Sequence, residues 1–258
     1  MGDPILISTQ ARVGIVELAR PEKFNCLSMR AWDLIDGARR TFESDAHVRA
    51  ILIRAQGKNF CTGADLDEVK SMGTDLDKMH AFVSRGHQAL LDMEASPLPV
   101  VAAVQGLCLA GGLELMLGAD VVFAARSARL GDQHAHYGLL PGWGGSQRLP
   151  RVVGLRRALD IMFTGRWLEA EEAREIGLLN HVVEDDALWS AALDYAVKLT
   201  ERSPRGLAEM KRLARNGLGL DPAQAMRLEI DAAVRHMAGR DTAEGLAAFT
   251  ARRKPDFG

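Results

Sequence analysis

The fold of this chain is decided by the stretch Gly106-Leu107-Cys108-Leu109-Ala110-Gly111-Gly112-Leu113-Glu114-Leu115. The apolar run 100–104 before it predicts a strand, paired glycines then turn the chain, and a short helix is expected over 111–117. Amide N–H groups in the first turn of a helix lack partners within the helix, and the helix dipole there favours negative charge. An oxygen that becomes anionic during a reaction could bind at such an amide. A helix cap, with glycines placed for tight packing, is the alternative that these residues also allow.

Strands alternate with helices on both sides of this stretch, which is typical of an α/β protein. We expect strands at 5–9, 13–18, 48–53, 100–104 and 121–125, and helices at 29–45, 76–93 and 111–117. After residue 187 the pattern changes, because helical periodicity covers 188–202, 204–216, 222–238 and 241–252 without a convincing strand. The sequence therefore predicts an α/β core over 1–187 and a helical oligomerisation region over 188–258.

Composition excludes several classes of protein. The chain has 258 residues, 47% of them hydrophobic, with a formal net charge of −2, so it carries no basic surface for nucleic acid. Cys26, Cys61 and Cys108 have neither metal-ligand spacing nor an even disulfide framework. No apolar run reaches the length of a membrane span, and the first ten residues lack the features of a signal peptide. We expect a cytoplasmic globular protein without a membrane partner.

Two further segments carry polar residues and glycines between apolar runs. The first, 59–66, is a loop in which Gly63 permits close backbone approach to a ligand. The second, 131–150, contains His134, His136, Trp143 and a pair of glycines. Alternating Asp132, His134 and His136 could imitate a metal cluster. One loop of mixed ligands is weak support for a metal site, and we predict none.

Taken together, these segments resemble the enoyl-CoA hydratase/isomerase (crotonase) superfamily. Residues 59–66 are similar to its F-x-x-G-A-D-[LI] loop, 106–114 to its G-x-x-x-G-G-G-x-E element, 138–149 to its G-[LI]-x-P-x-x-G-[GS]-x-Q-R-L stretch, and 20–27 to its R-P-x-x-x-N-A-[LM] opening. Residues 164–165, 177–180 and 248–254 follow in the family's order. The resemblance covers nearly the whole chain from about residue 10.

The resemblance implies a spiral of ββα units with a helical trimerisation region, assembled as a homotrimer or as a homohexamer made of two trimers. It implies an acyl-CoA substrate, no separate cofactor, and an oxyanion hole formed by the amides of Ala64 and Gly111. The coenzyme A contacts that it implies are Lys23, Cys26, Leu27, Ala64, Asp65 and Leu66, together with Phe249 and the cluster 252–254, including Arg253, from a neighbouring subunit.

The chain departs from the hydratase pattern at one catalytic position. Hydratases of the family place two glutamates beside one water; Glu114 matches the first, but His134 stands where the second belongs. Imidazole has an unperturbed pKa of about 6.5, so a Glu/His pair could still move both protons of a hydration near neutrality. The family's β-diketone hydrolases carry a histidine at this position but an acid where Trp143 stands. Its ethylmalonyl-CoA decarboxylase branch combines a glutamate, a histidine and a P-x-W-G-G loop similar to 141–145.

Three functions therefore remain open from the sequence. The first is an enoyl-CoA hydratase-type lyase, with Glu114 as principal acid/base and His134 as its partner. The second is a decarboxylase or C–C hydrolase that uses the same oxyanion hole, since loss of CO2 from a malonyl-type thioester also produces an enolate. The third is a non-catalytic acyl-CoA binding protein. In each of them we expect Trp143 to shape the acyl pocket.

Overall fold

Short runs of Val, Ile, Leu and Ala form the larger of two sheets in the computed structural model, which describes residues 2–258. Its strands, in spatial order, are β1 (Ile5–Gln10), β2 (Val13–Leu18), β3 (Ala50–Ala55), β4 (Val100–Val104), β6 (Val121–Ala125) and β9 (His181–Val183). The β1–β2 pair is an antiparallel hairpin and all later pairs are parallel. The central strands β3 and β4 are almost entirely buried, as parallel strands covered on both faces are.

The strands β4 and β6 of the larger sheet are each followed by a short strand of the smaller sheet. Its strands are β5 (Leu107–Leu109), β7 (Arg129–Gly131) and β8 (Leu168–Glu169), in that order. β5 follows β4 after two residues and runs parallel to β7, which follows β6 after three. A parallel bridge between Cys61 and Cys108 adds the loop after β3 to the same layer. Successive strand ends therefore lie side by side at one edge of this sheet.

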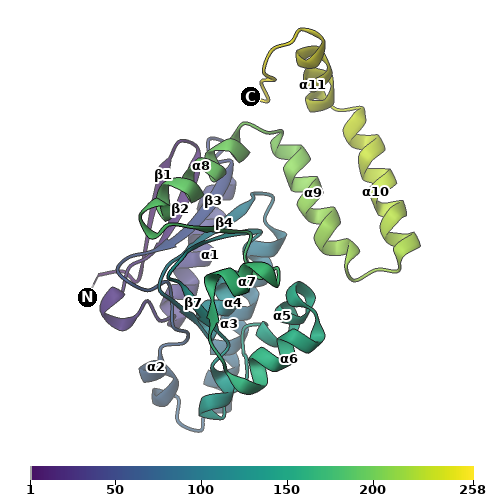
Figure 1. Cartoon of the computed structure of the whole chain (residues 1–258). Helices are drawn as coiled ribbons and strands as arrows, with labels where there is room; N and C mark the ends of the chain where they lie inside the picture. Colours follow the sequence, from purple (N-terminus) through teal and green to yellow (C-terminus); the bar gives the residue numbers. More distant parts are fainter. Residues whose placement is uncertain (1) are drawn as a thin grey trace.

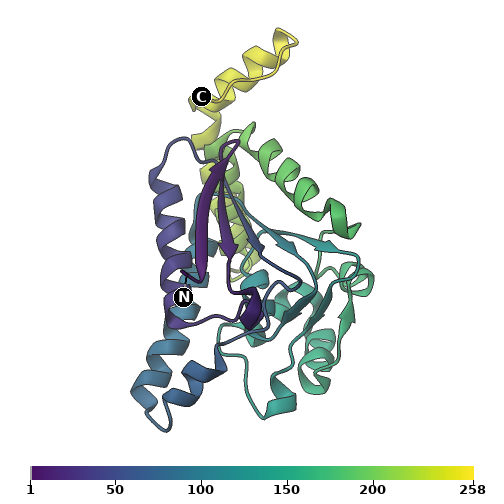
Figure 2. The same cartoon turned by 90° about the vertical axis from the view of Figure 1, so that its left-hand side faces the viewer.

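Helices cover both faces of the larger sheet (Figures 1 and 2). On one side α1 (Met29–Ser44) packs against α3 (Leu76–Ala95) and the β1–β2 hairpin, while on the other side α8 (Leu188–Thr200) crosses β2, β3, β4 and β6. The remaining helices of this part are α2 (Leu66–Ser71), α4 (Gly111–Leu117), α5 (Gly145–Val153), α6 (Leu155–Thr164) and α7 (Ala170–Glu175), with short 3-10 helices η1 (Pro21–Lys23), η2 (His134–Tyr137) and η3 (Asp185–Ala187).

The last three helices extend away from the sheets as an arm, which we define as α9 (Pro204–Gly217), α10 (Pro222–Met237) and α11 (Arg240–Thr250) (Figure 1). Of these helices, α9 contacts the core through Lys211 and Arg215, and the chain end after α11 returns to the core, where Arg12 donates to the carbonyl of Gly258. Large apolar side chains of the arm are exposed, namely Met210, Leu218, Leu220, Met226, Ile230, Val234, Met237, Leu246 and Phe249. No helix in residues 2–258 combines the length and apolarity that crossing a membrane requires.

The long helices and the central strands agree with the sequence predictions, while the two- and three-residue strands and several short helices were not predicted. The α/β class, the strands expected at 5–9 and 13–18, the first long helix and the helix 111–117 are confirmed; the two strands pair as a hairpin, and Ser28 caps α1. The strand expected at 48–53 was misplaced, because Val48 is buried before the strand and pairing with β2 continues to Ala55. The region after residue 187 is helical as expected, although α8 packs on the sheet and the projecting arm begins only with α9.

Candidate active site

Three loops meet where the strands of the smaller layer end. Leu109 N–H donates to the carbonyl of Cys61 over 2.9 Å, and Ala110 N–H donates to the carbonyl of Gly131 over 2.9 Å. These two bonds place the loop after Cys61, the start of α4 and the loop after β7 next to one another. They are the three segments that the sequence singled out.

The backbones of Gly63 and Gly111 approach each other closely at this junction. A Cβ atom added to Gly63 would lie 3.2 Å from the amide nitrogen of Gly111, and one added to Gly111 would lie 3.2 Å from the Cα of Gly63. The N–H groups of Ala64 and Gly111 have no hydrogen-bond acceptor within residues 2–258. Ala110, which precedes the helix, has φ 48° and ψ −118°, a conformation that alanine rarely adopts. This strained residue aims the first amide of α4.

Glu114 lies one turn into α4, with 1% of its surface exposed. Its Oε1 accepts hydrogen bonds from the amides of Trp143 and Gly145, each 2.7 Å long. Burial raises the pKa of this carboxyl above its ordinary value, while the Gly145 amide, the charge of His134 and the Trp143 amide limit the rise. The second oxygen, Oε2, points toward His134. Glu114 is therefore a fixed, buried carboxyl with one oxygen available for proton transfer.

His134 is held between two acids. Its Nδ1 is 2.9 Å from Oδ1 of Asp132, and its Nε2 is 3.9 Å from Oε2 of Glu114. Because an ionised carboxylate only accepts, Nδ1 carries the proton in the Asp132 contact. Burial by itself lowers the pKa of His134, but the hydrogen bond and charge of Asp132, with the charge of Glu114, outweigh burial and leave the pKa raised. The ring is thus fixed in orientation and favours its charged form.

The residues expected at the coenzyme A side lie together. Leu27 N–H donates to the carbonyl of Gly63 over 2.8 Å, and Leu27 forms a parallel bridge with Ala64. Asp65 caps α2 by accepting from the amides of Asp67 and Glu68, and it pairs with Arg20 over 2.9 Å. Lys23 contacts Asp67 over 3.0 Å. Cys26 lies between these groups, and burial, followed by the charge of Asp65, raises the pKa of its thiol to about 11.

Phe249 and Arg253 are not brought to this site within one chain. Both lie on or just after α11, at the opposite end of the molecule from α2 (Figure 1). Phe249 is exposed, and Arg253 forms an ion pair with Glu244. Their expected role in binding coenzyme A from a neighbouring subunit stays a prediction.

The sequence alone did not reveal how Glu114 and His134 are supported. The sequence shows Asp132 only as part of a metal-like pattern, yet it orients His134, while His136 contacts the carbonyl of Gly165. The signal in the sequence that could have revealed this contact is a carboxylate two residues before a histidine. The two amide donors to Glu114 come from a loop that no periodicity describes. Trp143, which we expect to shape the acyl pocket, is buried, and its ring lies 4.8 Å from Trp32 and 5.4 Å from Phe82 between ring centroids.

Comparison with known proteins defines the class to which this fold and site belong. The sequence profile of the enoyl-CoA hydratase/isomerase family matches residues 8–258. A probable enoyl-CoA hydratase of Rhizobium meliloti is 34% identical over 255 residues, covering 99% of this chain and 98% of the relative. The mitochondrial methylglutaconyl-CoA hydratase of Mus musculus is 34% identical, covering 90% of this chain and 75% of the relative. The chain belongs to the enoyl-CoA hydratase/isomerase family.

Solved structures share the whole architecture. An enoyl-CoA hydratase of Bacillus anthracis superimposes with a TM-score of 0.94 at 33% identity, covering 98% of each chain. Pseudomonas aeruginosa DspI has the same TM-score at 26% identity, covering 100% of this chain and 97% of its own. The crotonase fold class that the motifs indicated is therefore confirmed.

Proposed function

We propose that this chain is a lyase that adds water across the double bond of an α,β-unsaturated acyl-CoA thioester. The observation that carries the proposal is the Asp132–His134–Glu114 arrangement beside the two free amides. It supplies one carboxyl and one imidazole at a separation that suits a single water between them. Membership of the family, and relatives named as enoyl-CoA hydratases, support the same substrate class.

The amides of Ala64 and Gly111 are proposed to hold the thioester oxygen. As water attacks the β-carbon, the electrons of the double bond move toward this oxygen, and two preformed N–H donors stabilise the enolate. The close approach of the Gly63 and Gly111 backbones supports this assignment, because the Ala64 amide follows Gly63 directly in the chain. Loss of one donor of this kind typically costs about 2.7–4 kcal/mol of transition-state stabilisation.

Glu114 and His134 are proposed to divide the two proton transfers. A water oxygen can reach both Nε2 of His134 and Oε2 of Glu114, since these atoms are 3.9 Å apart. Glu114 takes a proton from the water as its oxygen bonds to the β-carbon, and protonated His134 gives a proton to the α-carbon. The proton on Glu114 then returns to His134, and both groups regain their starting states. The raised pKa of His134 supports its role as donor.

The direct test follows the conjugated thioester by its ultraviolet absorbance. We expect crotonyl-CoA, or a longer enoyl-CoA, to lose this absorbance with the wild-type chain and to keep it with Glu114→Gln. Glu169→Gln is a suitable control, because Glu169 pairs with Arg129 on the surface. Tight binding of coenzyme A esters without absorbance loss at any chain length would instead fit the non-catalytic binding function.

Decarboxylation of a malonyl-type thioester is the second candidate, and the charge of His134 favours it. An imidazolium held by Asp132 can bind the departing carboxylate, while the same amides receive the resulting enolate. In this reaction the bond between the α-carbon and the carboxylate breaks, CO2 leaves, and the α-carbon takes a proton. Release of CO2 from methylmalonyl-CoA or ethylmalonyl-CoA, abolished by His134→Ala, would support this candidate over hydration.

Assembly through the arm is proposed to complete the binding site. The exposed apolar side chains of α10 and α11 support an oligomer, because Met226, Ile230, Val234 and Met237 recur at helical spacing along α10, as an apolar face that packs against a partner does. A trimer or hexamer could place Phe249 and Arg253 of one subunit near the coenzyme A contacts of another. In that position Arg253 would exchange its contact with Glu244 for a phosphate of the substrate.

A further inference from the structure

The backbone of Trp143 hydrogen-bonds both to Glu114 and to the guanidinium of Arg148. Its amide donates to Oε1 of Glu114, while its carbonyl accepts from Nη1 of Arg148, and both bonds are 2.7 Å long. Arg148 lies on α5, only three residues after Gly145, the second amide donor to Glu114. A Cβ atom on Gly144 would lie 1.9 Å from Nη1 of Arg148, so the loop folds directly over this guanidinium.

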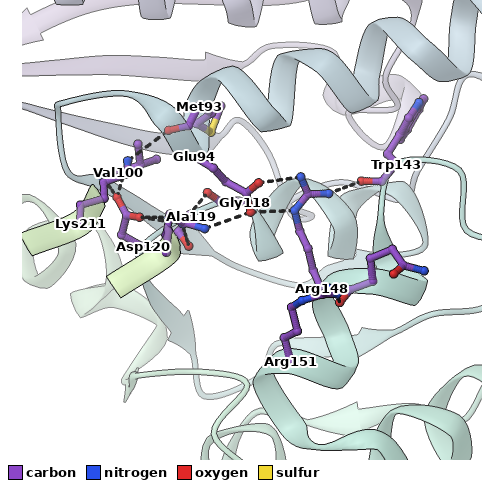
Figure 3. Close-up of polar contacts among 12 residues, drawn as sticks. Met93, Glu94, Val100, Gly118, Ala119, Asp120, Trp143, Arg148, Arg151 and Lys211 are labelled. Atoms are coloured by element: carbon purple, nitrogen blue, oxygen red, sulfur yellow. Dashed lines mark hydrogen bonds and ion pairs between the residues drawn. The ribbon is translucent and has the colours of Figure 1, made fainter. Parts of the chain in front are cut away.

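Arg148 is fixed by a carboxylate from another helix. Its Nε and Nη2 donate to the two oxygens of Glu94, near the end of α3, each over 2.8 Å (Figure 3). The Arg148 residue is 9% exposed. A forked contact of this kind fixes the plane of the guanidinium as well as its position. The third donor, Nη1, therefore has a defined direction toward the carbonyl of Trp143.

Glu94 is shared with the arm. Nη1 of Arg215 on α9 reaches Oε1 of Glu94 over 3.0 Å, and Nη2 of Arg215 reaches Oδ1 of Asp120 over 2.7 Å. One turn earlier on α9, Lys211 contacts Oδ2 of Asp120 over 2.8 Å and the carbonyls of Met93 and Leu98. Alternating charges thus run from α9 to the loop that holds Glu114, as the contacts in Figure 3 show.

We propose that Arg148 is a positioning residue for the reaction proposed above, because it fixes the loop amides that hold Glu114, and that Arg215 of the arm orients Arg148 through Glu94. The inference rests on the proposed function only in naming Glu114 as the base. Arg148 itself touches no reacting atom. In this network, Glu114 is held correctly only when α9 is packed against the core.

The property that reports this role is the pKa of Glu114. The groups that bear on it are burial in α4, the amides of Gly145 and Trp143, and the charges of His134 and Asp132. The two amides lower the pKa of Glu114. If Arg148 no longer holds the Trp143 carbonyl, the amides donate less well, and the pKa of Glu114 rises. A residue that contributes only to folding would leave this pKa unchanged in the folded protein.

The test compares Arg148→Gln with the wild-type chain labelled with carboxyl-13C glutamate. The Glu114 signal is assigned as the one missing in Glu114→Gln, and its titration is followed by NMR. We expect the Glu114 titration to move to higher pH, kcat to fall about tenfold and KM to change little. Arg148→Lys keeps the charge but not the fork, so a smaller shift is expected.

Arg151→Gln is the matched control, since Arg151 lies on the same helix and contacts only the carbonyl of Gln147 among the described residues. It should leave titration and kcat unchanged. Arg215→Gln should shift the titration in the same direction as Arg148→Gln, but less. If Arg148→Gln does not fold, the Glu114 titration is followed in the double variant Glu94→Gln/Arg148→Gln, which removes both charges of the buried pair together. An unshifted Glu114 titration in a folded variant would overturn the proposal, whether or not enoyl-CoA is the substrate.

Discussion

His134 shows how a buried imidazole is held between two carboxyl groups. The imidazole has Asp132 on one nitrogen at 2.9 Å and Glu114 opposite the other at 3.9 Å. Two carboxyls around one ring make its charged form favourable despite burial, and the pKa of His134 is raised. Glu114 also has a raised pKa, mainly because it is buried. The proposed hydration starts from ionised Glu114 and protonated His134, and the hydrogen bond and charge of Asp132 favour that state of the histidine.

The first prediction concerns Asp132→Asn. Without the charge of Asp132 the pKa of His134 falls, so the alkaline limb of the rate profile moves to lower pH. The acid limb moves less in the same direction, because the Asp132 charge is only a minor cause of the raised pKa of Glu114. The pH dependence of kcat/KM for an enoyl-CoA checks this. His136→Gln is the control, because His136 belongs to the same 3-10 helix but contacts the carbonyl of Gly165. An alkaline limb unmoved by Asp132→Asn would show that His134 does not titrate in the reaction.

The raised pKa of His134 also predicts that the stability of the protein depends on pH. Since folding raises the pKa of His134, its stabilising contribution is complete below the unfolded value of about 6.5 and is lost as pH rises through the folded value. The wild-type free energy of unfolding should therefore decrease over this interval. Asp132→Asn should show a smaller decrease in urea titrations at a series of pH values. An equal decrease in both proteins would contradict this account.

Ala110→Gly tests the strain at the first turn of α4. Alanine at φ 48° and ψ −118° costs about 1–3 kcal/mol, whereas the greater freedom of glycine in the unfolded chain costs about 0.4–1 kcal/mol. We expect the variant to be more stable by about 1 kcal/mol in urea unfolding. Ala38→Gly, in the middle of α1, should instead lose about 1 kcal/mol. A destabilised Ala110→Gly would mean that the backbone there is relaxed.

At the scale of elements, length decides what the sequence could predict. The long helices, the hairpin and the central strands followed from periodicity and capping. The three-residue strands β5, β7 and β9 are too short for any period, and only tertiary pairing defines them. Glu114 and His134 were named from motifs, but loop folding brings Asp132 to His134 and the Trp143 amide to Glu114. Arg148, which holds Trp143, is itself held by Glu94 of α3. Contacts between distant segments leave no local signal.

The cap of α2 gives a prediction at this scale. Asp65→Ala removes the cap and the ion pair with Arg20, so the free energy of unfolding should fall by about 1–2 kcal/mol. KM for the coenzyme A thioester should rise with little change in kcat. Asp75→Ala is the matched control, because Asp75 caps α3 without an arginine partner. It should destabilise the protein but leave KM unchanged.

The stability difference at Asp65 should depend on pH. Burial opposes ionisation, but the hydrogen bond and charge of Arg20 outweigh it and lower the pKa of Asp65. A group with a lowered pKa stabilises fully above its unfolded value, about 3.9, and loses this contribution as pH falls through the folded value. The gap between wild type and Asp65→Ala should therefore narrow in acid. A constant gap would assign the loss to packing alone.

At the scale of the whole molecule, a buried α/β core carries the proposed chemistry and an arm carries exposed apolar side chains. The charged contacts of α9 with Glu94 and Asp120 join the two parts. The proposed site therefore depends on the arm in two ways. The arm orients Arg148 within one chain, and its far end is proposed to reach the substrate of another.

Introducing a charge on the exposed face of α10 tests the role of the arm. Val234→Glu should reduce the oligomer, expected at three or six times the chain mass of 28.1 kDa, to smaller species in light scattering after gel filtration. KM for coenzyme A thioesters should rise with it. Arg227→Glu on the same helix is a comparison at a polar position. A wild-type chain that is monomeric at all concentrations would contradict the proposed assembly.

The central claim, that Glu114 and His134 add water to an enoyl thioester, is tested most directly by mass spectrometry of product mixtures. Enoyl-, malonyl- and β-keto-acyl-CoA esters are each incubated with the wild-type chain and with His134→Ala. We predict that the wild-type chain adds the mass of one water to the enoyl ester alone, and that the variant loses most of this activity. Loss of CO2 from a malonyl ester, with enoyl esters unchanged, would contradict the account.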